Sequence, residues 1–395
     1  MSIFSQSLAV IMMNLRSLPR RLWMSLAMVF ASAVVVAILL AFLAMAKGFE
    51  ATLEGAGSDD VAFLLRTGSA AELNSSVSKE QFNLIETAPG IASDENGPLV
   101  SPELYVIVDG IKKSSNTEAN IPLRGMHQKQ GVALRENFVL TQGRMFTDGT
   151  DELIVGEGIL REFNGFELGQ EIRFGKYTWK VVGVFSTGGN VFESELWADA
   201  KVIQNLYNRG SSYQSVRVKL QNAAGLDAVK AYVENEPRLN HDVTTESEYF
   251  AQQGKGLSYM AIFGRVISTV MALGALAGAL NTMYTSVADR AKEIATLRAL
   301  GFSHFSAFIG TLVEALFLAV LGGVLGSVAA FLIFDGMNAA TLGGSFTQVV
   351  FSFQLSEDLI YQGANMALII GFISGFFPAW RAARVPVVVA FQGGR

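Results

Sequence analysis

The distribution of charge along the chain constrains its fold more than any other feature of the sequence. Residues 22–46 carry no charged side chain over 25 residues. As a helix they would rise about 37 Å, more than the hydrocarbon core of a bilayer at about 30 Å. Three further apolar stretches follow, at 257–288, 305–334 and 359–380, so we expect four transmembrane helices. A cleaved signal peptide fits the first stretch less well, because the apolar region of a signal has only about 7–15 residues.

A large segment of ordinary globular composition, residues 48–256, separates the first two stretches. Its 209 residues are enough to bury a hydrophobic core of their own. It carries 29 acidic and 19 basic residues, and this net charge of −10 argues against nucleic acid as a partner. The chain contains no cysteine, so disulfides do not stabilise this domain.

The patterns within this segment indicate a mixed α+β domain, for which two compact lobes are plausible. Ser78 and Gln81 fit a capping box at the start of a helix. The segment 244–256 has no strong helix breaker, so we expect one helix to run from this domain into the second span. Other predicted elements are strands at 104–110, 177–186 and 215–220, a helix at 223–235, and a strand, turn and short helix over 152–163.

The basic residues predict the orientation in the membrane, because Lys and Arg concentrate on the cytoplasmic side. Arg16, Arg20 and Arg21 precede the first span, and further basic residues lie in 289–304 and 381–395. The connection 335–358 has no Lys or Arg. Both termini and the 289–304 connection are therefore expected in the cytoplasm, and residues 48–256 outside it.

A short charged segment, 289–303, lies between the second and third spans. Its spacing predicts an amphipathic helix that ends at Gly301. The predicted apolar edge is Ile294, Leu297 and Leu300, and the predicted polar side chains are Arg290, Lys292, Glu293 and Arg298. Such a helix is either a docking element for a cytosolic partner or a solvated loop with basic anchors, and the residues alone leave both open.

Small and ionisable residues mark the predicted spans. The pairs Gly274/Gly278, Gly322/Gly326 and Gly371/Gly375 have the spacing that lets helices approach closely. They serve packing within one bundle or, for one pair, a subunit interface. Arg265 is near enough to the outer end to extend toward the surface, whereas Glu314 lies deeper and is expected either to make a structural hydrogen bond or to act in coupling. The two lie at different depths and are not expected to pair.

The sequence lacks the motifs of an enzyme. His127, His241 and His304 are far apart, and neither H-E-x-x-H nor the phosphate-binding G-x-x-x-x-G-K-[ST] occurs. Gly156-Glu157-Gly158 is interpreted as a turn. We therefore expect no catalytic, cofactor or metal site here, and ATP, if used, must be bound with Mg²⁺ by another chain.

The run GALAGALNTMYTSVADRAKEIATLRALGFS (274–303) resembles the corresponding stretch of MacB/FtsX-type ABC transporter permeases. The family has an Asn in the second span, followed by the patterns V-x-x-R-x-x-E-I and A-L-G. The matching residues here are Asn281, Val287, Arg290, Glu293, Ile294, Ala299, Leu300 and Gly301. The third span is similar to the family's E-A-x-x-L-x-x-x-G-G-x-x-G, with Glu314 at the acid. The ending 375–392 is similar to P-A-x-x-A-A-x-x-x-P-x-x-A-L, with Phe391 replacing Leu. Residues 137–185 resemble the family's periplasmic core pattern, including G-R-x-F.

This resemblance implies a free-standing permease of the bacterial inner membrane. It implies a dimer, of two identical or two paralogous permeases, in which each copy docks on a cytoplasmic ABC ATPase. Movement would be transmitted through the spans to the periplasmic domain, for export of a substrate with a periplasmic adaptor and an outer-membrane channel. Alternatives within the family are extraction of lipoproteins from the inner membrane and an FtsX-like relay to cell-wall hydrolases, although the domain is larger than that of FtsX proper.

The residues expected to act fall into two groups. Contact with the ATPase is assigned to Arg290, Glu293, Ile294, Leu297, Arg298, Leu300 and Gly301. Transmembrane coupling or packing is assigned to Asn281, Glu314, Gly274, Gly278, Gly322, Gly326, Gly371 and Gly375. The predicted organisation is a cytoplasmic amphipathic segment 1–21, a span 22–47, the periplasmic domain 48–256, a span 257–288, a coupling helix 289–304, a span 305–334, a loop 335–358, a span 359–380 and a cytoplasmic tail 381–395.

Overall fold

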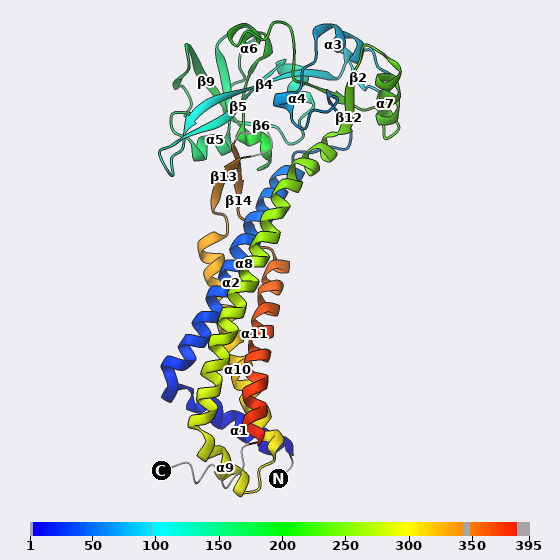
Figure 1. Ribbon diagram of the computed structural model, residues 1–395. Coiled ribbons are helices and arrows are strands. Elements are labelled where there is room, and N and C mark those ends of the chain that lie inside the picture. The colour runs from blue at the N-terminus through cyan, green and yellow to red at the C-terminus, as the bar shows by residue number, and fades with distance from the viewer. Residues whose placement is uncertain (1–2, 96, 343–347, 385–395) are drawn as a thin grey trace. The chain divides into compact units, whose positions relative to one another are not determined.

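A computed structural model describes residues 3–95, 97–342 and 348–384 (Figure 1). The chain forms two compact units, which are described separately. The membrane unit consists of Met1–Lys47, Tyr259–Met337 and Phe353–Arg395. The sheet unit consists of Gly48–Ser258 and Asn338–Ser352.

Long apolar helices make up the membrane unit. Four helical segments of the described chain are long and apolar enough to cross a bilayer, which confirms the predicted number of spans. The helices are α1 (Ile3–Ser17), the short η1 (Leu18–Arg21), α2 (Leu22–Glu54), α8 (Glu246–Asp289), α9 (Ala291–Ala299), α10 (His304–Phe334) and α11 (Glu357–Arg384).

Two of the three glycine pairs provide close contacts inside this bundle. A Cβ on Gly322 would lie 2.5 Å from the Val29 carbonyl oxygen of α2. A Cβ on Gly371 would lie 2.6 Å from Ala319 of α10, and Gly375 has a similar contact with Ala315. Glycine at these positions therefore lets α10 pack on both α2 and α11.

Helix α8 confirms the expected uninterrupted entry into the second span. It runs without a break for 44 residues and has residues in both units. Its first residue is Glu246, because Thr244 and Thr245 still belong to a strand that pairs with a neighbouring strand. The helix thus begins two residues later than predicted.

The sheet unit is built on one ten-stranded sheet. Its order is β12-β1-β11-β4-β5-β10-β7-β9-β6, with β8 paired to β9. The long strand β4 pairs with β11 through its first residues and with β5 through the rest, so it joins both halves. The two compact lobes suggested by the sequence would therefore share β4, and they stay a prediction. The strands are β1 (Val61–Arg66), β4 (Val100–Ile111), β5 (Glu118–Met126), β6 (Val139–Gly143), β7 (Glu152–Gly156), β8 (Glu171–Phe174), β9 (Tyr177–Ser186), β10 (Leu196–Asp199), β11 (Ser215–Lys219) and β12 (His241–Thr245); β2 (Ser93–Asp94) and β3 (Gly97–Pro98) form a separate pair.

Short helices accompany this sheet. The capping box is confirmed, since the Ser78 hydroxyl accepts from Gln81 N and the Gln81 side chain accepts from Ser78 N. Gly156-Glu157-Gly158 is not a turn, because β7 ends at Gly156 and a helix begins at the next residue. The helices are η2 (Glu72–Asn74), α3 (Lys79–Ile85), α4 (Gln128–Ala133), α5 (Glu157–Glu162), η3 (Val191–Ser194), α6 (Ala200–Leu206) and α7 (Gly225–Asn235).

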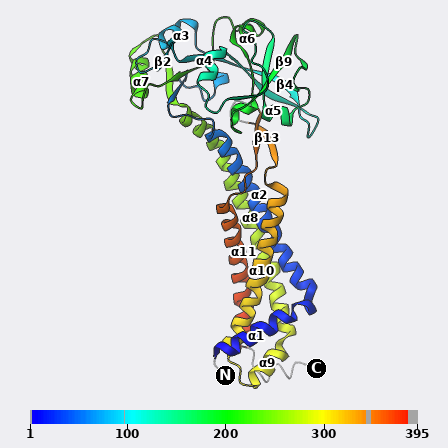
Figure 2. The same cartoon turned by 180° about the vertical axis from the view of Figure 1, so that it is seen from behind.

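The connection 335–358 contributes a β-hairpin to the sheet unit. Its strands β13 (Asn338–Leu342) and β14 (Gln348–Ser352) are antiparallel and lie beside α5 (Figures 1 and 2). The side chain of Val350 joins the main hydrophobic core of the unit. The sequence analysis treated this connection as a simple loop and missed the hairpin.

The G-R-x-F motif has a clear local structure. Gly143 has φ +73°, and a Cβ there would lie 2.2 Å from the Val182 carbonyl oxygen, which only glycine permits. Arg144 donates from Nη1 to Glu152 Oε2 at 2.7 Å and also bonds the second carboxylate oxygen. Phe146 is fully buried. The motif therefore fixes the turn between β6 and β7.

Candidate functional site

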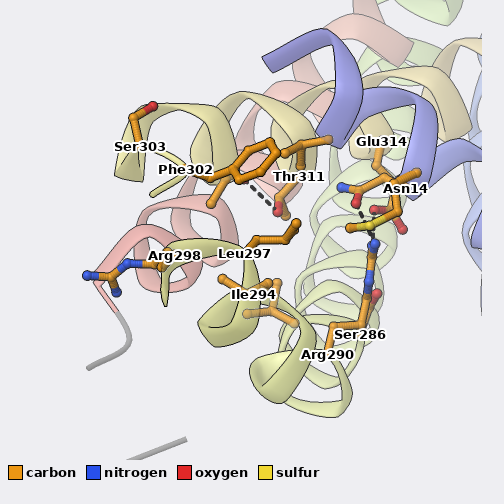
Figure 3. A pocket seen from close by; sticks show the side chains of 14 residues that line it. Asn14, Ser286, Arg290, Ile294, Leu297, Arg298, Phe302, Ser303, Thr311 and Glu314 are labelled. Carbon is orange, nitrogen blue, oxygen red and sulfur yellow. Dashed lines mark hydrogen bonds and ion pairs between the residues drawn. The ribbon is translucent and has the colours of Figure 1, made fainter. Parts of the chain in front are cut away.

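The charged helix α9 and the helix ends around it form the candidate site (Figure 3). Arg290 precedes α9 directly, where α8 has just ended, and its side chain is only 4% exposed. Its Nη1 donates to Glu314 Oε2 of α10 at 3.0 Å, and its Nη2 donates to Asn14 Oδ1 of α1. Figure 3 shows these three side chains turned toward one another from different elements. One guanidinium therefore ties together the start of α9, the third span and the N-terminal helix.

This geometry corrects two assignments made from the sequence. Arg290 was placed on the polar face of α9, but it is buried, because Glu314 and Asn14 satisfy its donors inside the protein. Leu300 was placed on the apolar edge, but it is 73% exposed, because the helix ends at Ala299 and the chain turns at Gly301. Gly301 does end the helix as expected, with φ +92°.

The inner face of α9 is held by a small apolar cluster. Ile294 packs with Val287 of α8, Ala307 of α10 and Ala382 of α11. Leu297 lines a cavity of about 20 Å³ between α1, α8, α9 and α10, which is room for about one water molecule. The inner face thus contacts elements from three membrane helices.

Polar contacts fix the chain on the far side of α9. Ser303 caps α10, since its hydroxyl accepts from Ser306 N at 3.1 Å. Ser303 N donates to Gln6 Oε1 of α1 at 3.0 Å. His304 Nδ1 lies 2.6 Å from the Ala383 carbonyl oxygen of α11. Both ends of α9 are therefore attached to the bundle.

The sequence analysis missed three residues of this site: Asn14, Arg21 and Ser286. Arg21 Nη1 donates to the Ser286 hydroxyl at 2.7 Å and to its carbonyl oxygen at 2.8 Å. Asn14 is 3% exposed and lies on α1, which packs across α10 at Gly310. Asn14 could have been noticed as a polar residue within an otherwise apolar helix. Its partner Arg290 is 276 residues away in the chain, so the sequence does not show what it binds.

The outer face of α9 remains open to a partner. The Glu293 side chain is 57% exposed and contacts Arg290 Nε at 3.3 Å. Lys292 and Leu300 are exposed as well. Helix α9 and the residue after it thus expose two charged side chains and one large apolar side chain.

The remaining predicted residues lie away from this site. Arg265 is exposed on α8 and, as expected, does not pair with Glu314. Asn281 is exposed on the same helix. Within the described chain, a Cβ on Gly274 or Gly278 would meet no heavy atom within 4 Å. The end of the C-terminal motif, including Phe391, lies outside the described residues.

Helix α9 is attached to both of the neighbouring spans. It is joined to α10 by the Arg290–Glu314 pair and to α8 by direct chain continuity. Removing one partner of such a buried pair typically costs about 3–5 kcal/mol, because the other charge is left uncompensated. The pair therefore keeps α9 fixed to the bundle.

Comparisons with known proteins agree with this description. The model of the MacB-like periplasmic core domain matches residues 24–236, and that of the FtsX-like permease C-terminal region matches residues 265–387. The chain is 24% identical to an ABC transporter permease of Methanocaldococcus jannaschii, over 72% of each chain. It is 23% identical to the macrolide export ATP-binding/permease protein MacB of Shewanella oneidensis, over 82% of this chain and 54% of MacB. It is 23% identical to the pyoverdine export ATP-binding/permease protein PvdT of Pseudomonas entomophila, over 64% of this chain and 40% of PvdT.

Two solved structures are similar to part of the chain. The periplasmic region of MacB from Actinobacillus actinomycetemcomitans is 18% identical, with TM-score 0.37, over 49% of this chain and 92% of that one. The extracellular domain of the transporter YknZ from Gram-positive bacteria is 17% identical, with TM-score 0.35, over 47% of this chain and all of that one. The chain thus spans about half or less of MacB and PvdT, which are named as combined ATP-binding and permease proteins. It spans 72% of the archaeal permease. The two family models cover both of its units, and the chain belongs to the MacB/FtsX-type ABC transporter permeases.

Proposed function

We propose that this chain is the permease subunit of an ATP-driven exporter that works by mechanotransmission. A separate cytoplasmic ABC ATPase docks on the outer face of α9, binds ATP and Mg²⁺, and pushes this helix. The push displaces α8 and α10 and moves the sheet unit on the other side of the inner membrane. The observation that carries the proposal is the buried Arg290–Glu314–Asn14 contact, which fixes the start of α9 to α10 and to α1.

Two further features support the proposal. Helix α8 has no break between the sheet unit and the site, so a displacement at one end is not absorbed by a flexible linker. The 395 residues contain no G-x-x-x-x-G-K-[ST] motif, so the proposed nucleotide site lies outside them. Export is favoured over lipoprotein extraction because two relatives are named for the export of macrolides and of pyoverdine. A periplasmic adaptor and an outer-membrane channel complete the proposed pathway.

The energy needed to move the sheet unit between two states can be estimated. Moving a two-state unit from 1:99 to 99:1 takes about 5.5 kcal/mol of differential binding. The contact between α9 and the ATPase must therefore differ between nucleotide states by a comparable amount. A docking helix that could rock freely on the membrane unit would lose this energy.

Glu293→Arg tests the docking face, because Glu293 is mostly exposed whereas Arg290 is buried. The thermal midpoint of the variant checks that loss of the contact between Glu293 and Arg290 Nε leaves the fold intact. Like charges placed together at an interface cost several kcal/mol, so we expect the affinity for the proposed partner ATPase to fall at least about tenfold. Affinity is measured with purified proteins in nanodiscs. Glu80→Arg, an exposed acid of α3 in the sheet unit, is the matched control. Unchanged affinity for the Glu293 variant would remove α9 as the docking element.

A further inference from the structure

The sheet unit is linked to the rest of the chain at four places. Helix α2 enters it at Gly48, and α8 leaves it after Ser258. The β13–β14 hairpin enters at Asn338 and leaves after Ser352. Any displacement of the spans therefore reaches the sheet unit through the end of α2, the start of α8 and the hairpin. One buried segment between β9 and β10, residues 190–195, contacts all three, and we call it the junction segment.

The contact with α2 is made by Asn190. Its Nδ2 donates to the carbonyl oxygen of Gly55, the residue directly after α2, at 3.1 Å. Its Oδ1 accepts from Phe192 N at 3.1 Å and from the Thr187 hydroxyl at 2.5 Å. Both ends of this amide are occupied, so its orientation is fixed.

The contact with α8 is made by Phe192. Its ring lies 5.7 Å from that of Phe250, edge to face, and Phe250 lies in the second turn of α8. The guanidinium of Arg217 lies 5.6 Å from the same ring. Arg217 in turn donates from Nε to Glu246, the first residue of α8, at 2.7 Å. The beginning of α8 is thus held both by a ring contact and by a charged hydrogen bond.

The contact with the hairpin is made by Ser194. Val350 N of β14 donates to the Ser194 hydroxyl at 2.9 Å, and Ser194 is 1% exposed. A Cβ on Gly158 of α5 would lie 3.3 Å from Val350 Cβ, so the hairpin strand sits closely on this part of the unit. Lys112 Nζ donates to the Ala340 carbonyl oxygen of β13 at 3.4 Å.

The junction segment is itself held rigidly. Glu193 Oε1 accepts from Thr187 N, Gly189 N and the Ser186 hydroxyl, at 2.9, 2.8 and 2.6 Å. Glu195 accepts from Arg124 Nη2 at 2.6 Å and Nε at 2.7 Å. Arg124 belongs to a buried ion cluster that links several strands of the sheet. The cluster consists of Arg124, Arg135, Arg217, Glu72, Glu103, Glu195 and Glu246, none more than 6% exposed.

We infer that the junction segment is the part of the sheet unit that collects displacements of α2, α8 and the hairpin and passes them to the sheet as one movement. The segment lies directly before β10 and follows β9 after three residues, to which Glu193 and Asn190 are hydrogen-bonded, so its displacement is passed to both strands. Asn190, Phe192 and Ser194 are then positioning residues for the transport cycle. This inference rests on the proposed function, because it assumes that nucleotide binding moves the spans.

The test measures movement and stability separately. The chain has no cysteine, so Lys129→Cys in the sheet unit and Asp358→Cys in α11 place one spin-label pair in each copy of the chain, and dilution with unlabelled chain isolates the distance within one copy. The distance between the labels is measured in the complex with its ATPase in nanodiscs, without nucleotide and after trapping with ATP and vanadate. We expect Asn190→Ala with Ser194→Ala to reduce the nucleotide-dependent distance change to less than half, while ATP binding and the thermal midpoint stay close to those of the parent pair.

Ser75→Ala is the matched control, since Ser75 is a buried serine of the same unit whose hydroxyl accepts one backbone N–H, from Arg66, at 2.8 Å. It should keep the full distance change. If the double variant does not fold, Ser194→Ala alone, which removes a single hydroxyl, decides the question. A full distance change in the folded junction variants overturns the inference. If the parent pair shows no nucleotide-dependent change, the proposed function fails instead, so the two failures are distinguishable.

Discussion

The carboxylates of the buried ion cluster differ in how their negative charge affects the stability of the fold. Burial opposes the charge of Glu103, but Arg135, Arg217 and Arg124 together hold its pKa well below the ordinary value. Burial raises the pKa of Glu246, and Arg217 only partly offsets it. The cluster has four carboxylates and three guanidinium groups, and Glu246 is the acid that the arginines compensate least. Its charge therefore opposes folding, whereas the charge of Glu103 supports it.

This difference predicts opposite effects of two matched substitutions. A raised pKa in the folded state means that the free energy of unfolding falls as pH rises from about 4.5 through the raised pKa. Glu246→Gln should therefore flatten the pH dependence in that range and leave stability at pH 8 unchanged or higher. Glu103→Gln leaves two arginines without their main partner and should cost about 3–5 kcal/mol at pH 8.

Both variants are followed by chemical unfolding of the full chain, with the fluorescence of the buried Trp179 and Trp197 as the signal. The stability that Glu103 contributes is present above its ordinary pKa and is lost as pH falls toward its lowered pKa. Equal losses for the two variants at pH 8 would contradict the assignment of opposite roles.

At the scale of elements, one face of α8 has no partner within the described chain. Gly274, Gly278 and Asn281 lie on this face, at spacings of four and three residues. An amide in the hydrocarbon core is costly unless it is hydrogen-bonded, and a G-x-x-x-G pair suits close helix contact. Of the two alternatives left by the sequence, packing in the bundle describes the other two pairs, and a subunit interface fits this one.

Gly278→Leu should therefore weaken self-association of the permease and leave its own fold intact. Mass in detergent, measured by light scattering, is expected to fall from that of a dimer to that of a monomer. Val324→Leu, at an exposed position of α10, is the control and should keep the dimer. A dimer that persists in Gly278→Leu would place the interface elsewhere, and an unfolded chain would show that Gly278 packs inside one copy.

The elements themselves were largely readable from the sequence, because local patterns determine them. Strand β9 and the capping box at Ser78 follow from alternation and from side-chain hydrogen bonding within four residues. The hairpin and the Arg290–Glu314 pair were not readable. Each depends on partners that lie more than twenty residues away in the chain. Val350 lies in a short apolar segment, and nothing in the neighbouring sequence distinguishes such a strand from a plain loop between two spans.

At the scale of the whole molecule, the proposed orientation places α9 inside the cell and the sheet unit outside. Intact cells are treated with a maleimide that does not cross the inner membrane but reaches the periplasm. Lys129→Cys should react in such cells, and Lys292→Cys should react only after the inner membrane is opened. Both positions are exposed, so the contrast reports the side of the membrane and not burial. Reaction of Lys292→Cys in intact cells would exclude the proposed docking of a cytoplasmic ATPase.

The hairpin has a consequence for how this architecture can be cut or exchanged. A fragment made of Gly48–Ser258 alone would lack Val350 and Phe351, leaving Ser194 and the ring of Phe49 without their contacts. Two separate stretches of the gene thus encode one folded body. A recombination event that swaps only the long insertion between related permeases would inherit a mismatched hairpin, so the two stretches are expected to be exchanged together or not at all.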